Sequence, residues 1–300
     1  MVGWILVGKK SVNLADVDNF ISVFEKNNLP LQKIMVETIS LCTDNFDGVF
    51  VNGIRYPLPD FIVPAFFGNF NFHSLCVVKM FESAGIFSTA SYSCLVDTKD
   101  KLKSFLMVKG KLKTVLLPKT ILFAKNITSS FLDKNFSFPL IAKINHGSKG
   151  DGVCIINNFK ELLTTANTLA EKFKDQILLQ EFIQTSIGKD LRIIVCGGEI
   201  ITAFLRQNTN DFKSNLNFGG TLKFIEPPLS LCNEALNIAK ILDINLGSVD
   251  FLLGANNSFY FCEANSMPGI TYSKTANENE LPDPLEQIAK NIKKQINTLF

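Results

Sequence analysis

Two carboxylates and one amide, Asp250, Glu263 and Asn265, could together bind a divalent cation. Hard oxygen ligands suit Mg²⁺, which proteins usually hold with one or two carboxylates plus substrate phosphates. Both acids interrupt otherwise apolar runs, and a buried carboxylate must be paired or bound to a metal. The alternative is that both acids are solvated charges on a turn, and this stretch alone leaves the two interpretations open.

The surrounding pattern predicts the element that carries these side chains. Two short apolar runs, residues 248–253 and 259–264, flank a Gly/Asn/Ser cluster, which is typical of a β-hairpin. Residues two apart on a strand point to the same face of the sheet. We therefore expect Glu263 and Asn265 to share a face.

The expected loop of this hairpin sets its register. If residues 255–258 form a four-residue loop, Gly254 faces Phe259. The same register places Asp250 opposite Glu263, with the side chains roughly 5 Å apart. Two carboxylates that close repel each other unless a cation lies between them.

An upstream loop has the composition of a phosphate-binding site. The apolar run 139–143 ends in Lys143, and glycines follow at positions 147, 150 and 152. Glycines let backbone amides approach and bond phosphate oxygens, while a lysine adds a point charge to the same phosphates. The simpler interpretation is a tight turn between two strands.

A buried strand at residues 177–180 leads into Glu181, and a short turn then leads to Asp190. Such a strand edge can bind an adenine ring through its backbone and leave an acidic side chain for the ribose. The alternative is that Glu181 and Asp190 are surface acids around the turn.

Two arginines, Arg192 and Arg206, interrupt apolar strands. They could pair with Glu181 or Glu199, or they could bind an anionic substrate. For Arg206 we favour the substrate, because this residue opens the polar loop at 207–220.

Composition limits the class of protein. The chain has 300 residues, of which 46% are hydrophobic and 19% charged, so it can form two or three domains. A net charge of +2 without a basic run excludes a nucleic-acid partner, and no apolar run is long enough to span a membrane. Seven cysteines without a C-x-x-C pair and an N-terminus unlike a signal peptide indicate reduced thiols in the cytoplasm.

The hydrophobic periodicity predicts an α/β protein. Strands alternate with helices to about residue 95, which favours a small parallel sheet. The expected strands lie at 4–7, 48–51, 61–63, 138–144, 152–156, 177–180, 191–196 and 199–206, besides the hairpin. The expected helices lie at 16–28, 74–84, 99–109, 159–173, 232–242 and 284–299.

In order and spacing, these pieces resemble the ATP-grasp superfamily, and within it the RimK-type glutamate ligases. The resemblance covers roughly residues 60–275 and is closest in DFKSNL from Asp211, Gly219-Gly220, and Glu263-Ala-Asn265 with Pro268-Gly269. It implies an ATP-grasp fold of three parts. These are an N-terminal parallel α/β domain (1–97), a central lid subdomain (98–182) and a C-terminal metal-binding subdomain (183–300).

The resemblance also implies a set of site residues. ATP would be bound by Lys101, Lys143, Ser148, Gly150, Gln180, Glu181, Phe182, Ile183, Asp190, Lys213, Ser214 and Asn215. Lys143 and Arg206 would act on the reacting groups. Asp250, Glu263 and Asn265 would hold two Mg²⁺ ions, with Mn²⁺ as a substitute. Phe182 replaces a common Tyr and Lys213 a common Arg, and we expect nucleotide binding to survive both.

The implied activity is ATP-dependent joining of a carboxylate to an amine through an acyl phosphate. The substrates would be glutamate or another amino acid, together with a peptide, protein tail or small metabolite. Pro64-Ala65 departs from a common Pro-Arg, so recognition of the acceptor could differ. A non-catalytic ATP sensor or scaffold is the alternative, and a D-alanine–D-alanine-type ligase fits the loop at 211–220 less well.

The sequence also predicts where further partners bind. Acceptor contacts are expected from the loops at 66–71 and 271–277. A Phe-rich surface on the N-terminal domain could form a homo-oligomer contact, with Phe61, Phe66, Phe67, Phe70 and Phe72 as its members.

Overall fold

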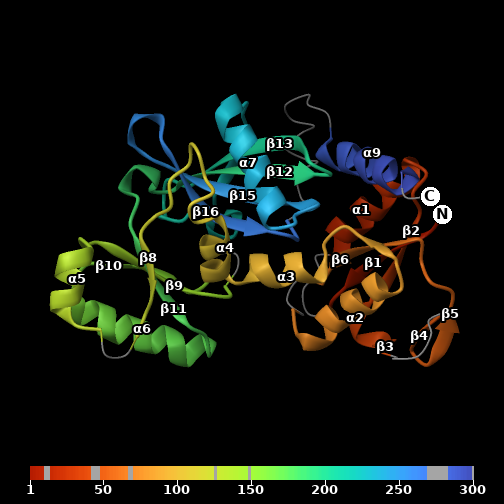
Figure 1. Ribbon diagram of the computed structural model, residues 1–300, viewed down its shortest axis with the longest axis horizontal. Helices are drawn as coiled ribbons and strands as arrows, with labels where there is room; N and C mark the ends of the chain where they lie inside the picture. The colour runs from red at the N-terminus through yellow and green to blue at the C-terminus, as the bar shows by residue number, and fades with distance from the viewer. Residues whose placement is uncertain are drawn as a thin grey trace.

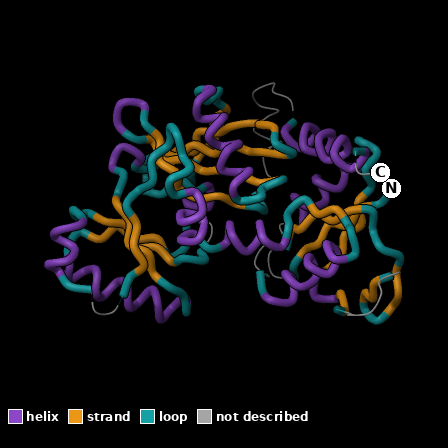
Figure 2. The backbone as a smooth tube through the Cα atoms, viewed as in Figure 1, coloured by secondary structure: helices purple, strands orange, loops and turns teal. Residues whose placement is uncertain are grey.

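The computed structural model describes residues 1–9, 14–41, 48–66, 70–124, 127–147, 150–268 and 283–298. Four β-sheets form the framework of this part of the chain. Figures 1 and 2 show the N-terminal elements at one end of an elongated molecule, a sheet with two helices at the other end, and the largest sheet between and above them. The α/β fold class predicted from the sequence is confirmed.

The N-terminal sheet is parallel throughout, with the strand order β2-β1-β6-β7. Helices α1 and α2 pack on its opposite faces, and every residue of β1 and β6 is buried, as parallel sheets require. The elements are β1 (Gly3–Val7), α1 (Leu14–Lys26), β2 (Leu31–Met35), β6 (Phe61–Ala65), α2 (Phe72–Ser83) and β7 (Phe87–Ser88).

Two expectations about this region are wrong. The strand predicted at 48–51 is β4 (Val49–Val51), and it joins β3 (Ile39–Ser40) and β5 (Ile54–Tyr56) in a separate antiparallel sheet. The Phe-rich surface is also not a surface, because the side chains of Phe61 and Phe66 are fully buried in the core. Phe67 lies outside the described residues, whereas Phe72 is 78% exposed.

The second sheet has the order β10-β9-β11-β8 and is antiparallel. Its strands are β8 (Thr120–Leu122), β9 (Leu140–Ile144), β10 (Val153–Ile156) and β11 (Ile177–Glu181), and its helices are α5 (Ser129–Asn135) and α6 (Phe159–Phe173). Leucine and alanine side chains at 162, 166 and 169 of α6 pack on the sheet at helical spacing. This sheet lies at the far end of the molecule from the N-terminus (Figure 1), and it is called the lid sheet below.

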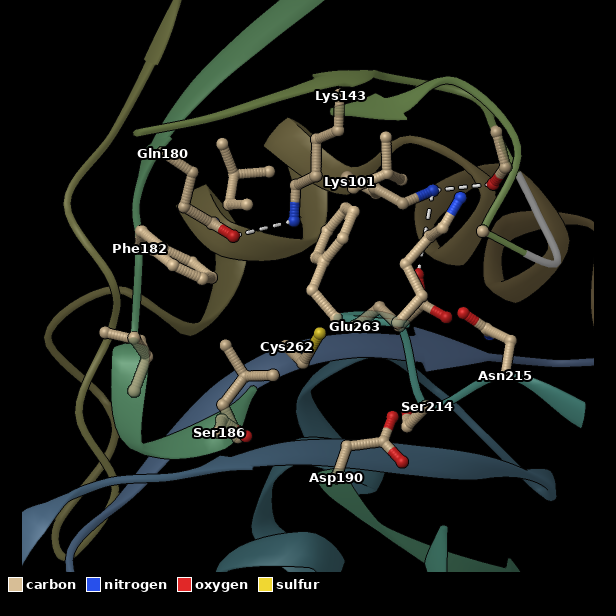
Figure 3. Close-up of a pocket in the computed structure, with 18 of the residues that line it drawn as sticks. Lys101, Lys143, Gln180, Phe182, Ser186, Asp190, Ser214, Asn215, Cys262 and Glu263 are labelled. Atoms are coloured by element: carbon tan, nitrogen blue, oxygen red, sulfur yellow. Dashed lines mark hydrogen bonds and ion pairs between the residues drawn. The ribbon is translucent and has the colours of Figure 1, made fainter. Parts of the chain in front are cut away.

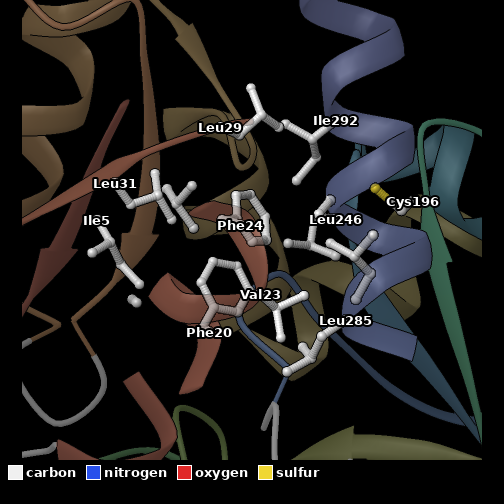
Figure 4. Packing of buried hydrophobic residues seen from close by; sticks show 14 of the residues in the cluster. Ile5, Phe20, Val23, Phe24, Leu29, Leu31, Cys196, Leu246, Leu285 and Ile292 are labelled. Atoms are coloured by element: carbon white, nitrogen blue, oxygen red, sulfur yellow. The ribbon is translucent and has the colours of Figure 1, made fainter. Parts of the chain in front are cut away.

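The third and largest sheet is antiparallel, with the order β14-β13-β12-β15-β16. Its strands are β12 (Lys189–Cys196), β13 (Glu199–Gln207), β14 (Thr221–Phe224), β15 (Leu246–Leu253) and β16 (Phe259–Asn265). Helix α7 (Leu229–Ile241) covers one face. The C-terminal helix α9 (Pro284–Asn297) packs on the other face and also on α1, so one core joins both ends of the chain (Figure 4).

The helix expected at 99–109 is confirmed as the second of two short helices, and the first was not expected. They are α3 (Tyr92–Lys99) and α4 (Lys101–Val108). Asp100 separates them because its backbone is extended (φ −89°, ψ 105°) and its side chain accepts a hydrogen bond from the amide of Lys103. An aspartate in this position is a strong N-cap, which a search for periodicity alone does not reveal.

No helix in the described ranges is both long and apolar enough to cross a bilayer. The six cysteines that the structure describes are free thiols. The expected cytoplasmic location stays a prediction.

The packing of α9 generates a prediction about stability. Ile292 of α9 is fully buried (Figure 4), so Ile292→Ala should lower the free energy of unfolding by about 2–5 kcal/mol through lost apolar contact and the remaining cavity. Lys290→Ala, an exposed change on the same helix, should alter it by less than about 0.5 kcal/mol. Denaturant unfolding followed by circular dichroism measures both. Equal stability of the two variants would contradict the packing described here.

Candidate functional site

A cavity lies between the lid sheet and the largest sheet. Figure 3 shows side chains from both sheets pointing into it. The polar residues that line it are Lys101, Lys143, Asp151, Gln180, Glu181, Ser186, Lys189, Asp190, Arg206, Lys213, Ser214, Asn215 and Glu263. The cavity therefore collects most of the residues that the sequence predicts for nucleotide binding, although the first and last of them, Lys101 and Asn215, are 114 positions apart along the chain.

Lys143 is a buried cation in this cavity. It is the penultimate residue of β9, a central strand of the lid sheet, and it is 5% exposed. The Nζ atom donates to Oε1 of Gln180 at 2.9 Å and lies 5.3 Å from the ring centre of Phe105. Burial lowers the pKa of the Lys143 ammonium, and the nearby Lys101 acts in the same direction. The hydrogen-bond acceptor of Lys143 is the neutral amide of Gln180. The positive charge of Lys143 is therefore available to an anionic ligand.

Lys101 connects the loop of the lid sheet to the largest sheet. Its Nζ donates to the carbonyl oxygen of Gly147 at 2.6 Å and lies 3.7 Å from Oε2 of Glu263 (Figure 3). The residue is buried at the start of α4, where Asp100 and Asn145 bond each other. Lys101 and Lys143 therefore enter the cavity from different elements and meet near the same carboxylate.

The glycine loop reaches the polar loop at 207–220. Gly150 has a positive φ of +80°, and a Cβ atom there would lie 2.7 Å from Oδ1 of Asn215. Only glycine allows this approach. Lys213 of the same polar loop lies with Nζ 3.7 Å from the ring centre of Phe218. Ser148, also predicted to bind phosphate, lies outside the described residues.

The strand edge predicted to hold adenine forms another wall. Gln180, Glu181, Phe182 and Ile183 all line the cavity. Gln180 has a positioning role, because its amide also donates to Thr120 at 2.8 Å while its oxygen holds Lys143. The side chain of Glu181 is turned away to accept from the amide of Lys119 at 3.2 Å.

A β-bulge aims two neighbouring side chains into the cavity. The predicted pairing of Gly254 with Phe259 is wrong, because Leu253 faces Phe259. The register shifts by one residue between Phe251 and Asp250. The predicted pairing of Asp250 with Glu263 is therefore confirmed. The shift makes Cys262 the extra residue of β16, and both Cys262 and Glu263 line the cavity instead of alternating (Figure 3).

Cys262 is a residue whose place in the site the sequence does not reveal. Nothing in the sequence marks the bulge that makes it line the cavity. Burial raises the pKa of the Cys262 thiol to about 12, so it remains neutral. The apolar walls were also missed, and they are formed by Ile141, Ile144, Val153 and Leu252.

Two arginines and two aspartates form a buried ionic network on the cavity side of the largest sheet. Arg192 donates to both oxygens of Asp250, at 2.8 and 2.6 Å. Arg206 donates to both oxygens of Asp190 and also to Oδ2 of Asp250 at 2.8 Å. Burial would raise the pKa of Asp250, but the two guanidinium groups hold it below its ordinary value.

This network corrects two pairings inferred from the sequence. Arg192 does not pair with Glu181 or Glu199, because strand β15 places Asp250 directly opposite it. Asp190, expected at a ribose, and Asp250, expected at a metal ion, are both bonded to arginine in this structure, and their predicted roles stay predictions. Asp250 lies directly opposite Glu263 but is fully buried, and Glu263 is the member of this pair that lines the cavity.

Glu263 and Asn265 lie side by side, as their spacing predicts. The Asn265 amide donates to Oε1 of Glu263 at 3.4 Å. The described part of the chain has no cluster of three or more His, Cys, Asp and Glu side chains that could hold a metal by themselves. The metal role of Asp250, Glu263 and Asn265 stays a prediction.

Comparison with known proteins links this geometry to one family. The sequence pattern of the RimK-like ATP-grasp domain matches residues 98–287, more than half of the chain. A curated relative, a probable alpha-L-glutamate ligase of Vibrio atlanticus (strain LGP32), is 32% identical over 251 residues, which cover 82% of this chain and 81% of the relative.

Solved structures share the fold at lower identity. The D-alanine–D-alanine ligase from Bacillus anthracis complexed with ATP has a TM-score of 0.72 at 18% identity, with all of both chains covered. A Chryseobacterium gregarium RiPP-associated ATP-grasp ligase in complex with ADP, a leader and a core peptide has a TM-score of 0.70 at 15% identity. That comparison covers 98% of this chain and 97% of the other.

The buried ionic network generates a prediction. Arg206→Met should lower the free energy of unfolding by about 3–5 kcal/mol, because it leaves the carboxylate of Asp190 buried without its main partner. In the double variant with Asp190→Asn the loss should be smaller than the sum of the two single losses. Denaturant titration of the four proteins gives the coupling energy. Additive losses would show that the pair is not coupled.

Proposed function

The chain belongs to the RimK-like ATP-grasp family, and on this premise we propose that it is an ATP-dependent ligase that joins the carboxylate of one substrate to the amine of another. The carboxylate oxygen attacks the γ-phosphorus of ATP, and ADP leaves. The amine then displaces phosphate from the acyl phosphate, which yields an amide. Both steps move negative charge, so positioning and charge neutralisation are the main tasks of the protein.

The observation that carries this proposal is the convergence of Lys101, Lys143 and Lys213 on one cavity that also contains Glu263. Three cations near a single space repel each other and favour a ligand with several negative charges. Lys143, whose pKa is lowered by burial, gains most from such a ligand. A triphosphate at this end of the cavity would place its adenine at Gln180–Ile183, along the strand edge.

The donor set next to Lys101 fits a hard divalent cation. Glu263 offers a carboxylate and Asn265 an amide oxygen, the ligand types that Mg²⁺ prefers, and substrate phosphates would complete the shell. Asp250 lies opposite Glu263 but is fully buried and already accepts three hydrogen bonds from Arg192 and Arg206, so it would join the set through a lone pair that these bonds leave open. A Mg²⁺ ion held there would neutralise phosphate charge and align the transferred group.

The reaction also requires that water be excluded from the cavity, and we assign this task to the lid loop, the loop of the lid sheet that contains Gly147 and Gly150. Gly150 comes close to Asn215, so the loop of the lid sheet and the polar loop of the largest sheet meet at the cavity that both of them line. An acyl phosphate hydrolyses if water reaches it. Arg206, on the floor of the same cavity, could turn from Asp250 toward the reacting phosphate, and we propose Arg206 and Lys143 as the residues that act on it.

For the substrates we propose a glutamate-like amino acid and a peptide, protein tail or small metabolite that carries a carboxylate. The names of the curated relatives support glutamate, and the peptide-bound ligase from Chryseobacterium supports a peptide. The expected acceptor loop at 271–277 lies outside the described residues. A non-catalytic ATP sensor is the second candidate, and it would bind nucleotide without turnover.

The ligase proposal predicts that ADP release depends on both an acid and an amine. Glu263→Ala should lower the rate of ADP release about 100-fold or more, because phosphate charge is no longer neutralised at this end of the cavity. Glu226→Ala, at an exposed position, serves as the control. A coupled ADP assay with amino acids and acidic peptides measures this. ATP binding without release of ADP in any combination would favour the sensor.

The convergence of three lysines on the cavity predicts weaker nucleotide binding in Lys143→Met. This change keeps the aliphatic part of the side chain and removes the charge, so the Kd for ADP should rise about ten- to hundredfold. Lys109→Met, at an exposed position after α4, should leave the Kd unchanged. Isothermal titration calorimetry compares the three proteins. An unchanged Kd in Lys143→Met would remove this lysine from the phosphate site.

A further inference from the structure

One buried hydroxyl lacks a hydrogen-bond partner. Ser248 of β15 is 0% exposed, and its Oγ is the only buried side-chain nitrogen or oxygen in the described ranges that has no partner. Such atoms are rare in native proteins, because a buried polar group loses water without gaining a replacement. The hydroxyl is therefore free to form a bond when the site binds a ligand.

The neighbours of Ser248 show where that bond can form. In the sheet it faces Ile194 of β12 on one side and Asn265 of β16 on the other. The side chain of Ile194 is apolar and fully buried. Directly opposed residues of an antiparallel pair project to the same face, with Cβ atoms roughly 5 Å apart. Asn265 is thus the cross-strand neighbour that can bond this hydroxyl.

The amide of Asn265 needs such a neighbour once a cation is bound. Its Nδ2 now donates to Oε1 of Glu263. If Oε1 and the amide oxygen both turn toward a cation, Glu263 no longer accepts this hydrogen bond, and the NH₂ group requires another acceptor. A Ser oxygen can accept as well as donate. The groups that orient metal ligands commonly act in this way.

We propose that Ser248 is a positioning residue that accepts a hydrogen bond from Nδ2 of Asn265 in the cation-bound state, and so directs the amide oxygen of Asn265 to the cation. This inference rests on the proposed function, because it assumes the cation site at Glu263 and Asn265. It explains why a hydroxyl is buried between an isoleucine and an asparagine. It also assigns the two ends of the amide to different partners.

The test measures how strongly Mn²⁺ increases the affinity for ADP, by calorimetry with and without the metal. Ser248→Ala should reduce this increase roughly tenfold and leave the metal-free affinity for ADP unchanged. Its Tm without metal should not fall, because the hydroxyl makes no bond in that state. A lower Tm with an unchanged response to Mn²⁺ would overturn the proposal and make Ser248 a structural residue.

Repeating the test in an Asn265→Asp variant shows whether Ser248 acts through the NH₂ group of Asn265. Asn265→Asp retains an oxygen ligand but has no NH₂ group, so adding Ser248→Ala to it should change the Mn²⁺ effect less than twofold. An equal loss in both backgrounds would contradict the proposal. Glu263→Ala separates this inference from the proposed function. If the wild-type protein shows no Mn²⁺ effect, or if Glu263→Ala retains the whole effect, the cation site itself fails and the role of Ser248 fails with it.

Discussion

The buried ionic network of Arg192, Arg206, Asp190 and Asp250 is the interaction on which the cavity end of the largest sheet depends. Four charges removed from water are tolerated only when each meets an opposite charge in good geometry. The bonds cross from β12 to β13 and from β12 and β13 to β15, so they connect three neighbouring strands. Any change of ligand at this end of the cavity must keep these charges compensated, which couples Arg206 to whatever binds nearby.

Two local departures from regular backbone build the rest of the site around this network. The bulge at Cys262 turns Glu263 toward Lys101 while the strand pair still places Asp250 opposite Glu263. The positive φ of Gly150 lets the lid loop approach Asn215. Bulges and glycines are costly within regular elements, and both occur here where a side chain or a loop has to meet a ligand.

The comparisons show why the site, and not the fold, carries the functional proposal. Solved structures with 15–18% identity share this architecture at TM-scores near 0.7, and they include a D-alanine–D-alanine ligase and a RiPP-associated ligase in complex with a leader and core peptide. A common fold therefore leaves the substrate open. The curated relatives at 30–32% identity have one name in common, and they narrow the proposal to a glutamate-like amino acid. The lysines and the pair Glu263 and Asn265 are the residues on which that proposal rests.

The sequence by itself determined the fold class, most of the strands and helices, and many of the polar residues that line the cavity, because hydrophobic periodicity, glycines and isolated charges are local signals. Lys143 and Glu263 could be predicted for this reason, whereas Lys101 and Lys213 followed from the family resemblance. The tertiary structure alone decided which side chains contact one another. The pairing of β12 with β15 places Asp250 opposite Arg192, where the two form an ion pair. The bulge in β16 makes Cys262 line the cavity. Burial and register depend on strands far apart in the chain, and a single sequence does not state which of them become neighbours.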